Sequence, residues 1–88
     1  MAPKHPPNSP LRKRSVVIGG RKSSLALEDA FWNALGEIAG SKHIVLNDLV
    51  RQIDNDRKQE KYPNLTSMIR LFVLDYYRQQ AALKRKEN

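Results

Sequence analysis

The fold is decided by residues 21–40, which read RKSSLALEDAFWNALGEIAG. In the first half, at residues 23–27, polar and apolar side chains alternate, which is typical of a half-buried β-strand. In the second half the apolar residues recur at three- and four-residue spacing, which predicts a helix beginning near Glu28. A strand carries unpaired backbone donors and acceptors on both edges and is rarely found alone. The sequence must therefore offer a partner for residues 23–27.

The rest of the chain holds few candidates for that partner. A short apolar run at residues 15–18 stops at two glycines and fits either an extra strand or an extended segment packed on the core. Helical periodicity predicts a second helix over VLNDLVRQIDNDRK, residues 45–58, and a third over LTSMIRLFVLDYYRQQAAL, residues 65–83. The third helix is so apolar that most of its sides must be covered. We therefore expect a mainly α chain with one short strand.

The size of the chain points to a second subunit. At 88 residues it lies close to the lower limit for a self-sufficient core. It has no cysteine, and His5 and His43 belong to no ligand-spaced cluster, so neither a disulfide nor a metal site is expected. No apolar run approaches the roughly 20 residues that span a bilayer, and the N-terminus lacks the apolar segment of a secretory signal. We expect a soluble, cytoplasmic protein.

The formal net charge of +7 is concentrated towards the two ends. Residues 1–22 carry six Lys or Arg and no acid, whereas residues 23–60 carry four bases and seven acids. Such a distribution favours a polyanionic partner such as nucleic acid, although a small protein also uses Lys and Arg for solubility. We divide the chain into a disordered basic arm at residues 1–14, a domain at residues 15–80 and a basic tail at residues 81–88.

A second copy of the chain would solve the pairing problem of residues 23–27. If the same strands of two chains pair antiparallel, the first two helices of both chains gain one shared core. This predicts an intertwined homodimer with an intermolecular antiparallel β-ribbon, in which residues 23–27 complete their hydrogen bonds only against the partner chain. The residues expected in the dimer core are Leu25, Leu27, Phe31, Leu35, Leu49 and Ile53.

The opposite face of such a ribbon would present Lys22, Ser24 and Ala26 from each chain. A two-stranded ribbon fits the major groove of B-DNA, which is about 12 Å wide. Lys donates to guanine acceptors, Ser donates or accepts, and the Ala methyl group suits the thymine methyl group. We therefore predict base contacts from these three residues and a contact of Arg21 with the DNA backbone. The alternative is a merely solvated strand face.

Three segments in this order resemble the ribbon-helix-helix superfamily of dimeric DNA-binding proteins: RKSSLALEDAFWNALGEIA, VLNDLVRQID and NLTSMIRLFVLDYYR. More narrowly, the chain is similar to a bacterial subgroup with an added C-terminal helix. The resemblance covers roughly residues 16–78. It implies base readout by the outward residues of the strand, as the residues themselves suggest. Ala26 is smaller than the polar or basic residue that related ribbons often carry at its position.

The resemblance also implies phosphate binding by backbone N–H groups at the start of the second helix, at about Val45, Leu46 and Asn47. A helix N-terminus favours an anion on physical grounds as well. Val45 stands where a Ser or Thr often caps this helix, so a side-chain hydroxyl is missing there. In the basic arm, Arg12, Lys13 and Arg14 are either backbone or minor-groove contacts or part of a solubilising tail.

Nothing in the sequence supports catalysis. The acid pairs Glu28-Asp29 and Asp54/Asp56 have no neighbouring histidine or nucleophile, and GGRKSS lacks the spacing of a phosphate loop. We therefore expect a nucleoid-associated transcriptional regulator, a repressor, that uses no cofactor or metal. One alternative is an antitoxin-like or adaptor module that binds a protein partner through its apolar third helix. Another is non-specific packaging of nucleic acid by the basic ends.

Overall fold

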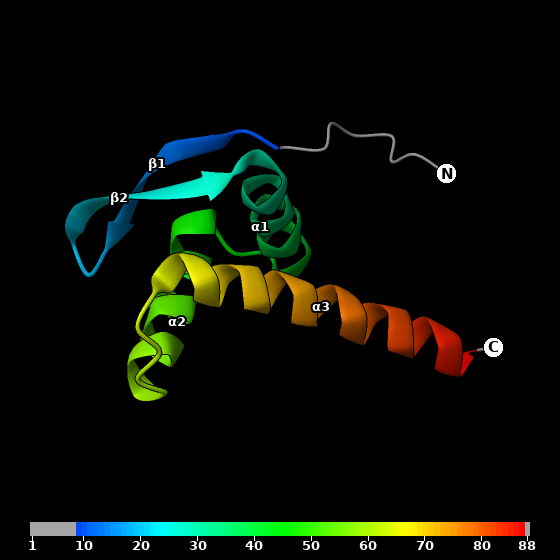
Figure 1. Ribbon diagram of the computed structural model, residues 1–88. Helices are drawn as coiled ribbons and strands as arrows, with labels where there is room; N and C mark the ends of the chain where they lie inside the picture. The colour runs from blue at the N-terminus through cyan, green and yellow to red at the C-terminus, as the bar shows by residue number, and fades with distance from the viewer. Residues whose placement is uncertain (1–8, 88) are drawn as a thin grey trace.

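The computed structural model describes residues 9–87, which form a β-hairpin followed by three helices (Figure 1). The strands are β1 (Leu11–Ile18) and β2 (Arg21–Glu28), and the helices are α1 (Asp29–Lys42), α2 (Leu46–Gln59) and α3 (Leu65–Glu87). Figure 1 shows the hairpin lying across one side of the helices, while the C-terminal end of α3 projects away from them. Within residues 9–87, no helix is both long and apolar enough to cross a membrane.

Residues 23–27 find a partner strand inside their own chain. β1 and β2 pair antiparallel, with Arg14 opposite Leu25 and Ser15 opposite Ser24. The prediction of a single strand per chain, and of hydrogen bonding only against a second chain, is therefore wrong. Gly19 and Gly20 explain the difference, because their φ angles of 58° and 78° form the tight two-residue turn that a hairpin requires.

The structured region extends beyond the predicted domain, residues 15–80, at both ends. Leu11–Arg14, which the sequence predicts to be part of a disordered arm, belongs to β1, and residues 1–8 of that arm lie outside the described residues. The basic tail expected at residues 81–88 is helical as far as Glu87. Basic residues are favourable in the last turns of a helix because they lie near the negative end of its dipole.

The core lies between the inner face of the hairpin and the three helices. Its buried apolar side chains are Val16, Leu25, Leu27, Leu35, Ile38, Ala39, Leu49, Val50, Ile53, Ile69 and Val73. Five of the six residues expected in a dimer core are thus buried within one chain, and Phe31 is half-buried against the same cluster. A single chain therefore buries most of the apolar side chains that the sequence predicts in a dimer core.

Candidate nucleic-acid interface

The hairpin has one face towards the helices and one face away from them. In an antiparallel pair, directly opposed residues share a face, so the outward residues of β2 are accompanied by the residues that they face on β1. The outward face carries six exposed side chains along the middle of the hairpin, Lys13, Ser15 and Val17 from β1 and Lys22, Ser24 and Ala26 from β2, and ends at the pair of Leu11 with Glu28. The structure therefore brings the three predicted base-contact residues together on an exposed surface, where the one acidic side chain, Glu28 at the strand end, is paired with Arg70.

The β1 half of the outward face was missed by sequence reasoning. The sequence alone assigns no contact to Ser15 or Val17 and predicts Lys13 on a disordered arm. The available signal was the alternation of Lys13, Ser15 and Val17 with Val16 and Ile18, followed by two glycines. Lys13 stays in the proposed interface, now held on a strand opposite Ala26.

Arg12 and Arg14 make contacts within the chain that the sequence did not predict. Their register places them on the inner face, opposite Leu27 and Leu25. Arg14 forms an ion pair with Asp29, and its guanidinium carbon lies 5.3 Å from the centroid of the Trp32 ring. The Nε atom of Arg12 is 3.2 Å from the other carboxylate oxygen of Asp29. Both arginines therefore attach β1 to the start of α1, and a contact of either side chain with the DNA backbone stays a prediction.

The start of α2 lies beside the free edge of β1. Val45 is the N-cap residue, with extended backbone and no hydrogen bond from its side chain, as its missing hydroxyl predicts. The N–H groups of Leu46 and Asn47 belong to the first turn and have no intrahelical acceptor. The Oδ1 atom of Asn47 accepts a hydrogen bond of 3.3 Å from the N–H group of Val17. The predicted phosphate-binding amides are thus placed next to the outward face.

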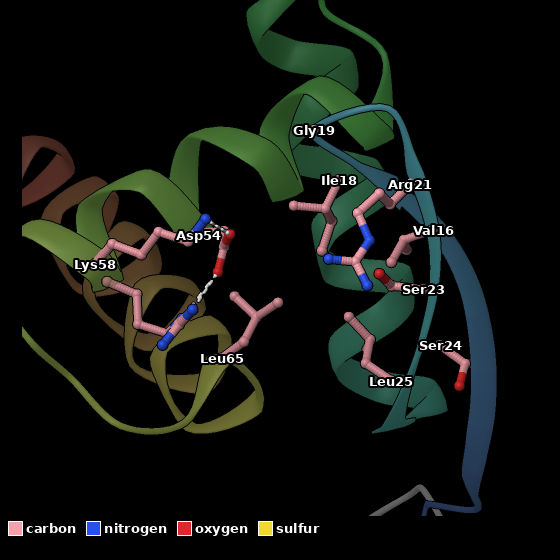
Figure 2. Close-up of a pocket in the computed structure, with 11 residues that line it drawn as sticks. Val16, Ile18, Gly19, Arg21, Ser23, Ser24, Leu25, Asp54, Lys58 and Leu65 are labelled. Carbon is pink, nitrogen blue, oxygen red and sulfur yellow. Dashed lines mark hydrogen bonds and ion pairs between the residues drawn. The ribbon is translucent and has the colours of Figure 1, made fainter.

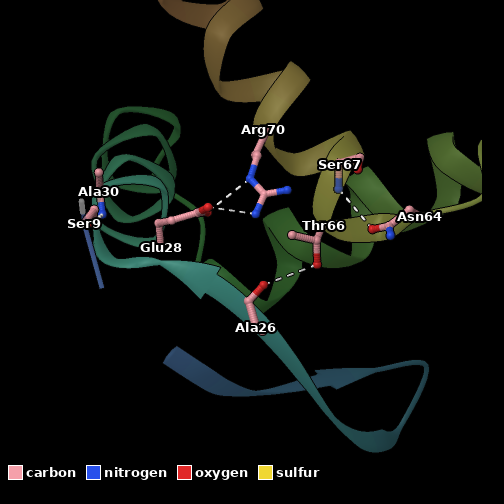
Figure 3. A network of polar contacts seen from close by, with 8 residues as sticks. All are labelled: Ser9, Ala26, Glu28, Ala30, Asn64, Thr66, Ser67 and Arg70. Atoms are coloured by element: carbon pink, nitrogen blue, oxygen red, sulfur yellow. Dashed lines mark hydrogen bonds and ion pairs between the residues drawn. The ribbon is translucent and has the colours of Figure 1, made fainter. Parts of the chain in front are cut away.

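The C-terminal end of β2 is fixed to α3 by an ion pair (Figure 3). Arg70 donates from Nε to Oε1 of Glu28 over 3.1 Å and from a terminal nitrogen to Oε2 over 2.9 Å. These charge-assisted hydrogen bonds hold the pKa of Glu28 below its ordinary value. Arg70 also lies over the ring of Phe31, 5.9 Å from its centroid. The pair therefore positions the strand end, α1 and α3 relative to one another.

We expect the stability that this pair contributes to disappear in acid. The folded-state pKa of Glu28 is lowered, so its contribution is complete above the unfolded-state pKa and is lost as the pH falls through the folded-state pKa. Urea unfolding of the wild type and of Glu28→Gln should differ at neutral pH, and this difference should shrink as the pH falls through the lowered folded-state pKa of Glu28. Glu60→Gln, on an exposed residue, is the control. A difference for Glu28→Gln that is unchanged in acid would contradict this role of the ion pair.

A cavity of about 470 Å³ lies between the inner face of the hairpin and the junction of α2 with α3 (Figure 2). Leu25 and Leu65 line it from opposite sides, and Arg21 stands at its rim beside the turn. Asp54, which is only 4% exposed, accepts a hydrogen bond of 2.9 Å from Arg57 and lies 3.4 Å from Nζ of Lys58. The cavity is therefore lined by apolar side chains together with a group of charged side chains from α2.

The outward face and the start of α2 together suit an anionic surface. Two lysines and two serines supply donors, and the exposed Ala26 and Val17 supply methyl groups. Among the described residues, no group of three or more His, Asp or Glu side chains is placed to hold a metal ion. The arrangement is suited to recognition of a polyanion through direct contacts.

Comparison with known proteins places this arrangement in a family context. Residues 11–77 match the family model described as a ribbon-helix-helix domain. Among solved structures, the chain is similar to an uncharacterized protein from Bordetella pertussis Tohama I, with 28% sequence identity and a TM-score of 0.73. The match covers 85% of this chain and 62% of that one, so the chain spans less than two thirds of that protein's length. No curated protein matches the chain significantly.

Proposed function

Because the chain belongs to the ribbon-helix-helix family of DNA-binding regulators, we propose that it acts as a homodimeric transcriptional repressor that binds duplex DNA in the major groove. The observation that carries this proposal is the outward face, where Lys22, Ser24 and Ala26 lie exposed on a two-stranded ribbon. The proposed action is binding without catalysis, at chromosomal DNA in the bacterial cytoplasm.

Each element of the interface has a separate task in this proposal. Lys22 donates to the O6 or N7 acceptor of a guanine, Ser24 contacts a base edge, and Ala26 packs against a thymine methyl group. The amides of Leu46 and Asn47 bind a phosphate and fix the ribbon at its depth in the groove. Arg21, exposed beside the turn, contacts the DNA backbone. A dimer seated in this way on a promoter represses by occluding it.

We expect Lys22→Ala to weaken binding to a preferred duplex roughly tenfold or more, since it removes one base contact from each half-site. The preferred duplex is first selected from a random pool at physiological salt. Fluorescence anisotropy then compares that duplex with a scrambled one. Lys84→Ala, an exposed lysine on the projecting part of α3, is the matched control and should leave both affinities nearly unchanged. Equal losses for Lys22→Ala on both duplexes would contradict base readout.

A second candidate function, an antitoxin-like or adaptor role, is favoured by one surface of α3. Leu71 and Leu74 are 48% and 53% exposed and border a cavity of about 400 Å³ that Met68 and Phe72 also line. An apolar surface of this kind suits a helix of another protein. A gel shift with the protein alone separates the two functions. If it binds no DNA at low salt, the adaptor role is favoured over the regulator.

A further inference from the structure

The C-terminal part of α3 extends beyond the other elements of the chain (Figure 1). Among the described residues of this helix, Val73 is the last buried one, and residues 77–85 are all exposed. Most of the stability of a helix in a protein comes from packing against other elements, because a short helical segment alone is only marginally stable in water. Within residues 9–87, the projecting part of α3 has little such packing.

One face of α3 carries a regular line of side chains into this projecting part. Its six members recur at alternating three- and four-residue spacing, which places them along one stripe of the helix surface. We call this stripe the α3 seam, and it consists of Met68, Leu71, Asp75, Arg78, Ala82 and Arg85. Met68 is half-buried and the other five residues are exposed. The seam is therefore accessible to a second helix.

The charges on the α3 seam are ordered along the helix and lack ionic partners at its middle. Asp75 accepts a hydrogen bond of 2.9 Å from the uncharged Gln79. Within residues 9–87, neither Asp75 nor Arg78 takes part in an ion pair. Glu60 lines the cavity of about 400 Å³ at the first half of the seam, whereas Arg85 lies near the other end. One half of this surface is therefore acidic and the other half is basic.

We propose that α3 pairs antiparallel with α3 of a second copy of this chain, seam against seam, around a two-fold axis between Asp75 and Arg78. In this register Asp75 faces the partner's Arg78, and the two-fold symmetry repeats the contact on the other side of the axis. Both unpaired charges of each chain thus gain a partner. A parallel pairing would instead place each seam charge opposite its own counterpart, and like charges at facing positions oppose association.

The same register matches the apolar residues of the α3 seam. Leu71, which is 48% exposed, lies opposite the partner's Ala82, whose small side chain leaves room for it. Met68 lies opposite the partner's Arg85, and the apolar stem of an arginine covers such a residue while its charged end stays in water. Glu60 lines the same cavity as Met68 and is therefore placed to meet that charged end. Each member of the seam thus has a complementary neighbour.

The α3 seam shares no residue with the outward face of the hairpin, so pairing through α3 leaves that face open to DNA. The inference goes beyond the proposed function, because it adds a surface of self-association to the one predicted for the ribbon. Two such surfaces on each chain join DNA-binding dimers into larger assemblies with more than one DNA-binding face. The seam is short, so we expect the pairing to reverse on dilution and to leave α3 exposed in the separate subunit.

Single cysteines test the register, because the chain has no cysteine of its own. Leu71→Cys and Ala82→Cys are prepared separately, mixed under reducing conditions and then mildly oxidised. The proposed pairing brings the two positions opposite each other, within disulfide range, whereas each position lies roughly 16 Å from its own counterpart along the helix axis. On a non-reducing gel we expect a linked dimer from the mixture and little from either variant alone.

Two results of this cross-linking would overturn the proposal. A linked dimer from each variant alone would indicate a parallel pairing. If the mixture gave no linked dimer, α3 would not pair with itself, and the adaptor role of its apolar surface would be favoured. The experiment uses the protein without DNA, so its outcome is independent of the proposed function.

Charge reversal tests the ion pairs across the axis and includes a rescue. Arg78→Glu removes two ion pairs and adds two like-charge contacts, so it should weaken self-association by roughly tenfold in sedimentation equilibrium. The double variant Asp75→Arg/Arg78→Asp exchanges the two charges and should restore association. Lys84→Glu is the matched control, because it changes the net charge equally from the opposite side of α3. Equal weakening by Lys84→Glu, no effect of Arg78→Glu, or no recovery in the double variant would overturn the pairing.

Discussion

Replacing Val16 by aspartate is expected to lower the free energy of unfolding by roughly 3 kcal/mol or more. Val16 is 2% exposed and belongs to the same buried cluster as Leu27 and Leu35. A carboxylate at this position would lose its hydration without gaining a partner, so the folded state would release β1 or protonate the group. Urea unfolding followed by circular dichroism measures the effect.

Val17→Asp provides the matched control, because the same substitution is made one residue further along the same strand. Val17 is 43% exposed and lies on the outward face. We expect its effect on stability to stay within about 0.5 kcal/mol. A large difference between the two variants would establish that β1 is part of the core. Small and equal effects would contradict the packing of β1 against the helices.

Leu27→Ala is the second substitution with a large expected effect, a loss of roughly 2 to 5 kcal/mol in the free energy of unfolding. The side chain of Leu27 is fully buried, at 0% exposure, at the end of β2 that leads into α1. Its truncation removes apolar contacts and leaves a cavity that the rigid strand cannot close. The loss is measured by urea unfolding at a fixed protein concentration.

Leu74→Ala makes the same chemical change at an exposed position of α3. Leu74 is 53% exposed, so we expect a cost well below that of Leu27→Ala. Repeating both measurements at a higher protein concentration adds information, because association stabilises the folded state by mass action. If the cost of Leu74→Ala equalled that of Leu27→Ala, this surface of α3 would have to be covered in solution, contrary to the structure of the subunit.

The helical part of the fold could be predicted because its residues interact locally. The apolar spacing of Leu49, Val50 and Ile53 predicted α2, and the run from Leu65 predicted the start of α3. The family and the order of elements followed from the same segments. Five of the predicted core residues are buried because a residue on the apolar face of a helix or strand stays buried whichever chain covers it.

β1 could not be predicted with the same certainty because its inner face is half basic. Arg12 and Arg14 occupy two of the four inward positions, so the apolar alternation is reduced to Val16 and Ile18. These arginines are acceptable there only because Asp29 and Trp32 lie beside them, and those contacts depend on the folded arrangement. The DNA contacts themselves remain proposals, because the folded chain shows which side chains are presented and not what they bind.

The hairpin described above also separates folding from association. In a ribbon made only between chains, neither strand can form its hydrogen bonds until the two molecules meet. The folding of such a subunit therefore depends on its association with a second one. Here β1 holds β2 extended beforehand, so the conformational entropy of residues 21–28 is already lost within one molecule. We therefore expect a reversible equilibrium between folded subunits and pairs. Occupancy of a promoter would then respond steeply to the amount of protein in the cell.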